Sequence, residues 1–139
     1  MASFNKFNSF AEAIAEKVHN LGSDQLKVAL TNTAPVAANT KLSDLTSVLA
    51  TTNLSGATPF NITTTSSLQT SGTYKLVLAD LVLTATGAVG PFRYIAIYNS
   101  TATNSELIGW YDYGSSISLA NGDTFTIDFD ASNGVLTLA

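Results

Sequence analysis

The chain beyond Phe60 is divided into short apolar runs by turn-forming residues, and this division constrains the fold more than any other feature. The runs contain four to nine residues each, at 60–68, 74–79, 81–85, 92–99, 107–112, 116–119, 124–129 and 135–138. Pairs such as Ser71-Gly72, Gly114-Ser115 and Asn121-Gly122 separate them at the short, regular spacing of β-hairpins. This spacing is typical of an antiparallel sandwich or barrel.

Side-chain alternation supports the same fold class. In residues 124–129, Phe125, Ile127 and Phe129 share one face and polar residues share the other, which predicts a half-buried antiparallel strand. Residues 25–30 alternate in the same way. The Ala79-Asp80 step interrupts a longer apolar run and predicts a bend where the strand passes from one sheet to another. We therefore expect an antiparallel β-sandwich or jelly roll of about seven to nine strands.

One amphipathic helix is predicted before the strands, at residues 9–22. Its apolar residues recur at helical spacing, at Phe10, Ile14, Val18 and Leu21. Ser9 and Glu12 match the capping box, in which each side chain bonds a free backbone N–H of the first turn. Gly22 is suited to the left-handed residue that ends a helix.

The chain is expected to be a single domain spanning residues 1–139. It divides into an N-terminal arm at 1–8, the helix at 9–22, a long connection at 31–57 with a short helical turn, and a β-rich core at 58–139. Phe4 and Phe7 make the arm a candidate for docking onto a partner. The connection is of the length at which interaction loops are common, and its candidate contacts are Pro35, Leu42 and Leu45.

Charge and composition exclude several classes of function. Only 12% of residues are charged, and the net charge is −4, so the chain lacks the basic patch that nucleic-acid binding requires. With no Cys it has neither disulfides nor a thiolate metal site. No signal peptide or membrane span is recognisable, so we expect a soluble protein made in the cytoplasm and not bound to a membrane. A surface so poor in charge is suited to contacts with neighbouring subunits.

Residues able to carry chemistry are few, and each has a structural interpretation. The single histidine, His19, lies near the end of the predicted helix, where a cation caps the last carbonyl groups. The late acidic residues are expected on solvent faces or in turns, at Asp112, Asp123, Asp128 and Asp130. No nucleophile elbow or phosphate-binding glycine motif occurs. The sequence predicts no enzyme activity, no metal site and no cofactor.

The aromatic residues of the last third leave two interpretations open. Trp110 is expected in the core, which leaves Tyr111 and Tyr113 as exposed partner contacts. Alternatively, Tyr98, Tyr111 and Tyr113 form the platform of a carbohydrate-binding module, because aromatic rings with polar groups stack on sugars.

One further pattern spans most of the chain. It comprises residues 90–94 (GPFRY), 107–114 (LIGWYDYG) and 121–123 (NGD), together with the opening 4–40. In these segments the chain resembles small virion structural proteins of tailed bacteriophages. The resemblance implies a non-catalytic subunit present in many copies, made in the bacterial host cytoplasm and located in the virion.

Within a virion, the favoured location is the capsid exterior. There a decoration, or cement, protein would bind and stabilise the major capsid protein lattice, bridging its subunits with the arm and the connection. A tail, neck or fibre component that binds other virion proteins is the alternative. Self-association is expected, and a trimer would suit a capsid lattice.

Overall fold

The computed structural model describes residues 2–139, and these residues form nine β-strands, one α-helix and one 3-10 turn. The elements in chain order are β1 (Phe4–Lys6), α1 (Ser9–Ala15), β2 (Leu26–Thr31), the 3-10 turn (Leu42–Asp44), β3 (Thr64–Thr70), β4 (Thr73–Leu78), β5 (Leu81–Thr84), β6 (Val89–Asn99), β7 (Leu107–Leu119), β8 (Thr124–Ile127) and β9 (Leu136–Leu138). The predicted fold class, a mainly β antiparallel sandwich with one N-terminal helix, is confirmed.

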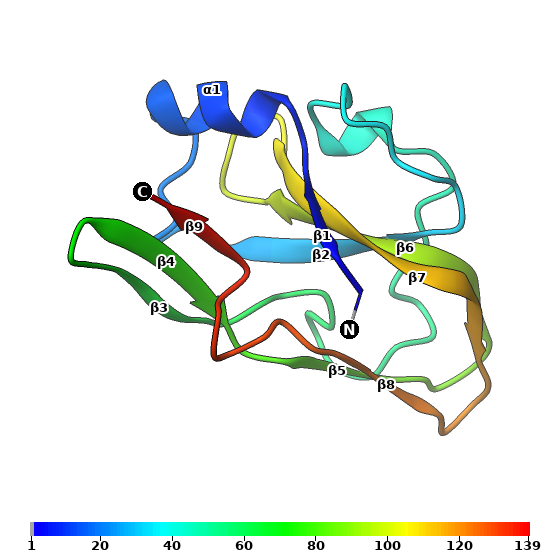
Figure 1. The fold of residues 1–139 in the computed structure, drawn as a ribbon. Coiled ribbons are helices and arrows are strands. Elements are labelled where there is room, and N and C mark those ends of the chain that lie inside the picture. Colours follow the sequence, from blue (N-terminus) through cyan, green and yellow to red (C-terminus); the bar gives the residue numbers. More distant parts are fainter. Residues whose placement is uncertain (1) are drawn as a thin grey trace.

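The strands form two layers (Figure 1). One layer is a four-stranded sheet in the order β1-β7-β6-β2. The other consists of a three-stranded sheet, β3-β4-β9, and a two-stranded sheet, β5-β8. All of these pairs are antiparallel. The chain passes from the three-stranded to the two-stranded sheet between β4 and β5, which confirms the bend predicted at Ala79-Asp80.

Apolar side chains are buried on both faces of the four-stranded sheet. The main core fills the space between the layers and includes Phe92, Leu76 and Phe129, each fully buried or nearly so. A second group, here called the outer cluster, lies on the opposite face and consists of Phe7, Ala29, Leu45, Ala96 and Leu107. β6 contributes to both, which makes it a central strand in a doubly covered sheet.

The helix is shorter than its sequence pattern predicted. It ends at Ala15, and the Ser9–Glu12 capping box is absent because Asn8 occupies the N-cap position and makes no side-chain bond. Lys17, not Gly22, takes the left-handed conformation, with φ of 67°. The N–H groups of Lys17 and Val18 bond the carbonyls of Ile14 and Ala13, which is the Schellman ending of a helix. The chain then turns inward, so that Leu21 reaches the core from a loop.

The N-terminal arm is part of the chain's own sheet. Phe4 pairs with Tyr111 and Lys6 with Gly109 as β1 adds to the edge of β7. The Phe4 ring lies directly over Gly109, and a Cβ atom at Gly109 would also approach the Asn5 carbonyl oxygen to 2.6 Å. The absence of a side chain at Gly109 is therefore what allows β1 to dock.

Several strand boundaries differ from the sequence prediction, and the largest differences concern β7 and β3. Residues 107–119 form one continuous strand, because Gly114, with φ of 83°, sits in a bulge instead of a turn. The strand predicted from Phe60 begins only at Thr64. Phe60 and Ile62 instead bond the backbone of β2, through Val28 N–H to the Phe60 carbonyl and Ile62 N–H to the Leu26 carbonyl.

We predict that Gly109→Ala lowers the free energy of unfolding by about 1–3 kcal/mol, because the new methyl group must displace Phe4 or the Asn5 carbonyl. Urea denaturation measures this value. Gly22→Ala is the matched control, since a Cβ there meets its nearest neighbour at an ordinary 3.5 Å. Equal stability of the two variants would contradict this account of β1 docking.

Candidate functional site

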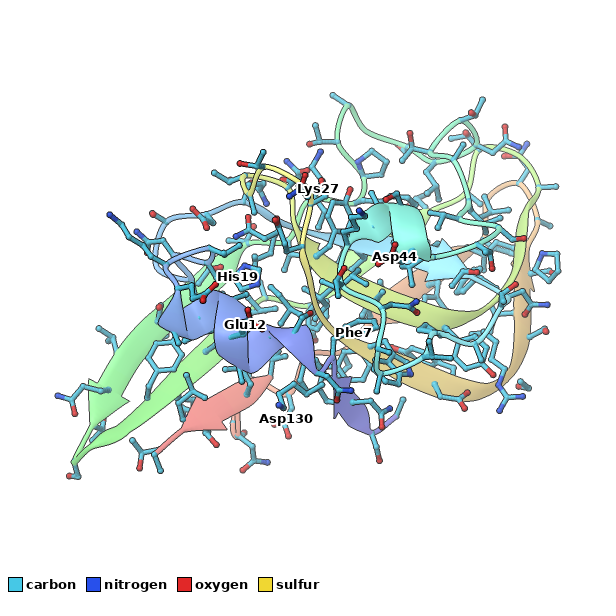
Figure 2. All side chains as sticks on the ribbon, turned by 90° about the horizontal axis from the view of Figure 1, so that it is seen from above. Phe7, Glu12, His19, Lys27, Asp44 and Asp130 are labelled. Carbon is cyan, nitrogen blue, oxygen red and sulfur yellow. The ribbon has the colours of Figure 1, made fainter. Side chains whose placement is uncertain are left out.

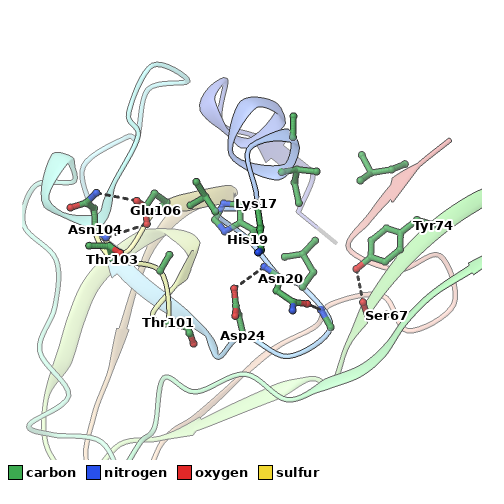
Figure 3. A pocket seen from close by; sticks show the side chains of 17 residues that line it. Lys17, His19, Asn20, Asp24, Ser67, Tyr74, Thr101, Thr103, Asn104 and Glu106 are labelled. Atoms are coloured by element: carbon green, nitrogen blue, oxygen red, sulfur yellow. Dashed lines mark hydrogen bonds between the residues drawn. The ribbon is translucent and has the colours of Figure 1, made fainter.

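An open groove of 1080 Å³ lies at the end of the sandwich, between α1, the loop that follows it, the loop before β7 and the inner face of the β3-β4-β9 sheet (Figure 3). Apolar residues line part of it, among them Ile14, Val18 and Leu138. Its titratable side chains include Lys17, His19, Asp24, Tyr74 and Glu106. The groove therefore collects the only histidine of the chain and two carboxylates.

Asn99, at the end of β6, organises the polar residues behind this groove. Its side chain is fully buried and makes four hydrogen bonds. The Oδ1 atom accepts from the backbone N–H groups of Thr101 and Ala102, at 3.0 and 3.2 Å. The Nδ2 atom donates to Asp24 Oδ2 at 2.6 Å and contacts His19 Nδ1 at 3.0 Å. All donor and acceptor positions of this amide are thus occupied.

These bonds determine the protonation state of His19. Because two backbone N–H groups fix the Oδ1 position of Asn99, its amide nitrogen must donate to His19 Nδ1. An accepting Nδ1 carries no proton, so the ring is neutral with its proton on Nε2. Burial lowers the pKa of His19 below 6.5, and the carboxylates of Glu106 and Asp24 oppose this shift only in part.

The sequence position of His19 predicted a capping role at the end of the helix. This prediction is wrong. The ring lies beyond the end of α1, is 6% exposed and stacks on Phe10 at 5.6 Å between centroids. Its Nε2 atom is buried and has no hydrogen-bond partner among the described residues. The ring is consequently a packed core group with one unsatisfied donor, and neither nitrogen is open to the groove as a base.

Several polar side chains of the groove are bonded to one another. Asp24 accepts from the Asn20 backbone N–H at 2.8 Å, and Ser67 and Tyr74 share a hydrogen bond of 2.8 Å (Figure 3). Asn104 donates to Glu106 at 3.1 Å. The bonds of Asp24 and Glu106 order loops that border the groove, and the Ser67–Tyr74 bond joins β3 to β4.

The late acidic residues lie in turns or at the surface, as predicted, and Asp112 in addition pairs with Arg93. Asp123 accepts from the Ala120 N–H. Asp130 accepts from the side-chain amide of Asn133 and from the backbone N–H groups of Asn133 and Ser132, and these bonds hold the pKa of Asp130 below its usual value. Asp112 forms a two-bond pair with Arg93 at 2.7 and 3.0 Å, and this pair lowers the pKa of the Asp112 carboxyl. Within residues 2–139, no group of three or more His, Asp or Glu side chains is arranged to hold a metal ion.

Four of the seven predicted partner contacts are buried in the chain itself, and these predictions are wrong. Phe7 and Leu45 belong to the outer cluster, Tyr111 to the main core, and Pro35 is buried within the connection. The other three are half-buried and rest against the two clusters: Phe4, Leu42 and Tyr113. Figure 2 shows Phe7 beneath the surrounding chain. Phe7, Leu42 and Leu45 cover the outer face of the sheet, whereas Phe4, Tyr111 and Tyr113 belong to its strands and pack against the main core.

The proposed carbohydrate platform is not formed. Tyr98 packs against the outer cluster, whereas Tyr111 and Tyr113 pack in the main core, on the opposite face of the four-stranded sheet. Burial raises the pKa of Tyr113 to about 12 and raises that of Tyr111 further. Trp110, expected in the core, is instead half-buried beside Phe7, because the β6–β7 register directs Tyr111 inward.

The 31–57 connection presents the remaining candidate surface. Leu45 and Leu54 anchor it in the outer cluster and the main core, and the predicted helical turn is present at Leu42–Asp44. Val36 and Val48 remain 57% and 38% exposed. The connection contains only two charged residues, Lys41 and Asp44, and Asp44 is bonded to the N–H groups of Thr40 and Lys41. It is thus an anchored and nearly uncharged surface.

Comparisons with known proteins found no relative of this chain. No protein-family model matches it, and neither a curated protein nor a solved structure does so. Among the helices of residues 2–139, none is long and apolar enough to cross a membrane.

We predict that Asn99→Ala lowers the free energy of unfolding by about 2–4 kcal/mol, because it leaves two backbone N–H groups, His19 and Asp24 without their partner. Urea denaturation measures the change. Asn104→Ala removes an exposed asparagine from the same loop and should alter stability by less than about 0.5 kcal/mol. A similar loss in both variants would contradict a central role for Asn99.

We also predict that stability depends on pH through His19. Its pKa is lower in the folded chain than the value of 6.5 in the unfolded chain, so the unfolded state binds more protons between the two values. The contribution of neutral His19 to the free energy of unfolding should be fully present above pH 6.5 and should decrease as the pH falls below this value. His19→Gln should remove this dependence. Nitrogen NMR of the imidazole should show the neutral Nε2–H form at neutral pH, and a charged ring there would contradict the assignment.

Proposed function

We propose that this chain is a non-catalytic structural subunit of a tailed-phage virion, and specifically a capsid decoration protein that binds the major capsid lattice. The observation that carries the proposal is the anchored, nearly uncharged outer surface of the 31–57 connection. Such a surface can dock without the cost of removing water from charged groups. The sequence resemblance provides the setting.

The fold supports a binding role over a catalytic one. The single histidine is bonded to Asn99 through one nitrogen and buried at the other. Asp112 pairs with Arg93 at the surface, and Asp123 and Asp130 accept backbone hydrogen bonds in turns. The histidine and these aspartates thus serve the fold.

The arm has a different role from the bridging one expected from the sequence. Because β1 pairs with β7 and Phe7 is buried, the arm stabilises the subunit. Contact with the capsid lattice is therefore assigned to the connection, with Val36 and Val48 as the apolar contacts.

Purified chain mixed with phage particles that lack it should bind in hundreds of copies per particle, measured by co-sedimentation and quantitative gel. Val36→Glu or Val48→Glu should weaken binding by roughly tenfold or more, because each places a charge in an apolar contact. Val82→Glu is the matched control, since Val82 is 56% exposed on β5. Binding in only a few copies would place the chain in the tail, neck or fibre, and the absence of binding would contradict the virion proposal.

A further inference from the structure

The β3–β4 hairpin extends from the body of the sandwich and carries β3 at the free edge of its sheet (Figures 1 and 2). β3 contains seven residues, TTSSLQT, with neither a charge nor a proline. On its outer side, no backbone hydrogen bond joins residues 64–70 to another described segment. The strand therefore leaves a row of donors and acceptors open to another strand.

The hairpin turn defines which backbone groups point outward. Ser71 and Gly72 have φ values of 51° and 83°, the left-handed pair of a two-residue type I′ turn. In such a hairpin the residues beside the turn, Thr70 and Thr73, face each other through backbone bonds, and the pattern alternates along the strand. The N–H and C=O groups of Ser67 and Gln69 are therefore directed away from β4.

Several other edges of the described sheets are better protected. β1 and β9 contain three residues each, and β1 ends in a lysine. The outer side of β2 is covered by the backbone of Leu49, Phe60 and Ile62. Short or charged edges discourage pairing with other chains, whereas a long uncharged edge promotes it. β3 has only one of the usual protections, a register shift near Thr65 at the end far from the turn.

We propose that two copies of this chain pair through β3, antiparallel, about a two-fold axis at Leu68. In this register Ser67 of each copy faces Gln69 of the other, so that the outward N–H and C=O groups bond one another. Leu68 then faces its own counterpart in the closely spaced position of the ladder. The two three-stranded sheets become one continuous sheet of six strands.

The observations favour a second copy as the partner for two reasons. Leu68 is 68% exposed, more than any other large apolar side chain among the described residues, and this register covers it with an identical leucine. The strand carries no charge, so identical strands meet without like-charge repulsion. A two-fold contact uses the same patch on both subunits, which is the commonest symmetry of protein assemblies. This inference concerns the isolated chain and does not depend on the virion proposal.

Crosslinking tests the register directly, because the chain contains no cysteine of its own. In Leu68→Cys the two sulfur atoms lie across the axis, with Cα atoms about 4.5–5.5 Å apart, a separation suited to a disulfide. Mild oxidation should convert this variant to a covalent dimer. Val82→Cys, equally accessible on β5, should remain largely monomeric. Equal crosslinking of the two variants would overturn the proposal.

Sedimentation tests the association without a crosslink. The wild-type chain should form a species of about 29 kDa, twice the 14.5 kDa of the monomer, as its concentration rises. Leu68→Lys should raise the dissociation constant by at least about tenfold, because two ammonium groups would face each other. Val82→Lys should leave the constant unchanged. A wild-type chain that stays monomeric into the millimolar range, or a Leu68→Lys chain that stays dimeric, would refute pairing through β3.

Discussion

Burial of the four-stranded sheet on both faces is the constraint on which the rest of the structure depends. β6 directs Ile95 and Ile97 into the main core and Ala96 into the outer cluster, so neither face can remain in water. The opposite layer covers the first face. The second has no layer of its own, and the chain covers it with Phe7 and Leu45. The arm and the connection are therefore needed to bury the outer face of the sheet, whether or not they also contact a partner.

Sequence patterns correctly predicted the features that depend on neighbouring residues in the chain. The period of two placed Ile127 and Phe129 in the core, and the Ser71-Gly72 pair identified a hairpin turn, because both features depend on neighbouring residues. The burial of Phe7 and Tyr111 could not be found in this way. It depends on which strand covers which face, and β1 meets β7 across more than 100 residues of chain. Gly109 was the one available signal, since a strand glycine marks close backbone approach.

The helix end shows how a distant contact overrides a local pattern. Apolar spacing through Val18 and Leu21 favoured a helix to Gly22, yet the chain leaves the helix at Lys17. Asn99, at the far end of β6, requires a partner for its buried amide, and His19 provides one only if the chain turns inward. The helix itself ends in the local Schellman motif at Lys17, and the buried network of Asn99 then fixes the position and the neutral state of the histidine beside the groove.

The small number of charged residues affects the surface of the molecule as well as its packing. Because the sheet buries apolar side chains on both of its faces, few large ones remain exposed, and Thr, Ser and Asn provide much of the polar surface. These residues solvate the chain without repelling another copy of it. An edge made of them, such as β3, is open to pairing with another strand. Edge strands that stay unpaired often carry a lysine or proline, and residues 64–70 contain neither, which supports the proposed pairing through β3.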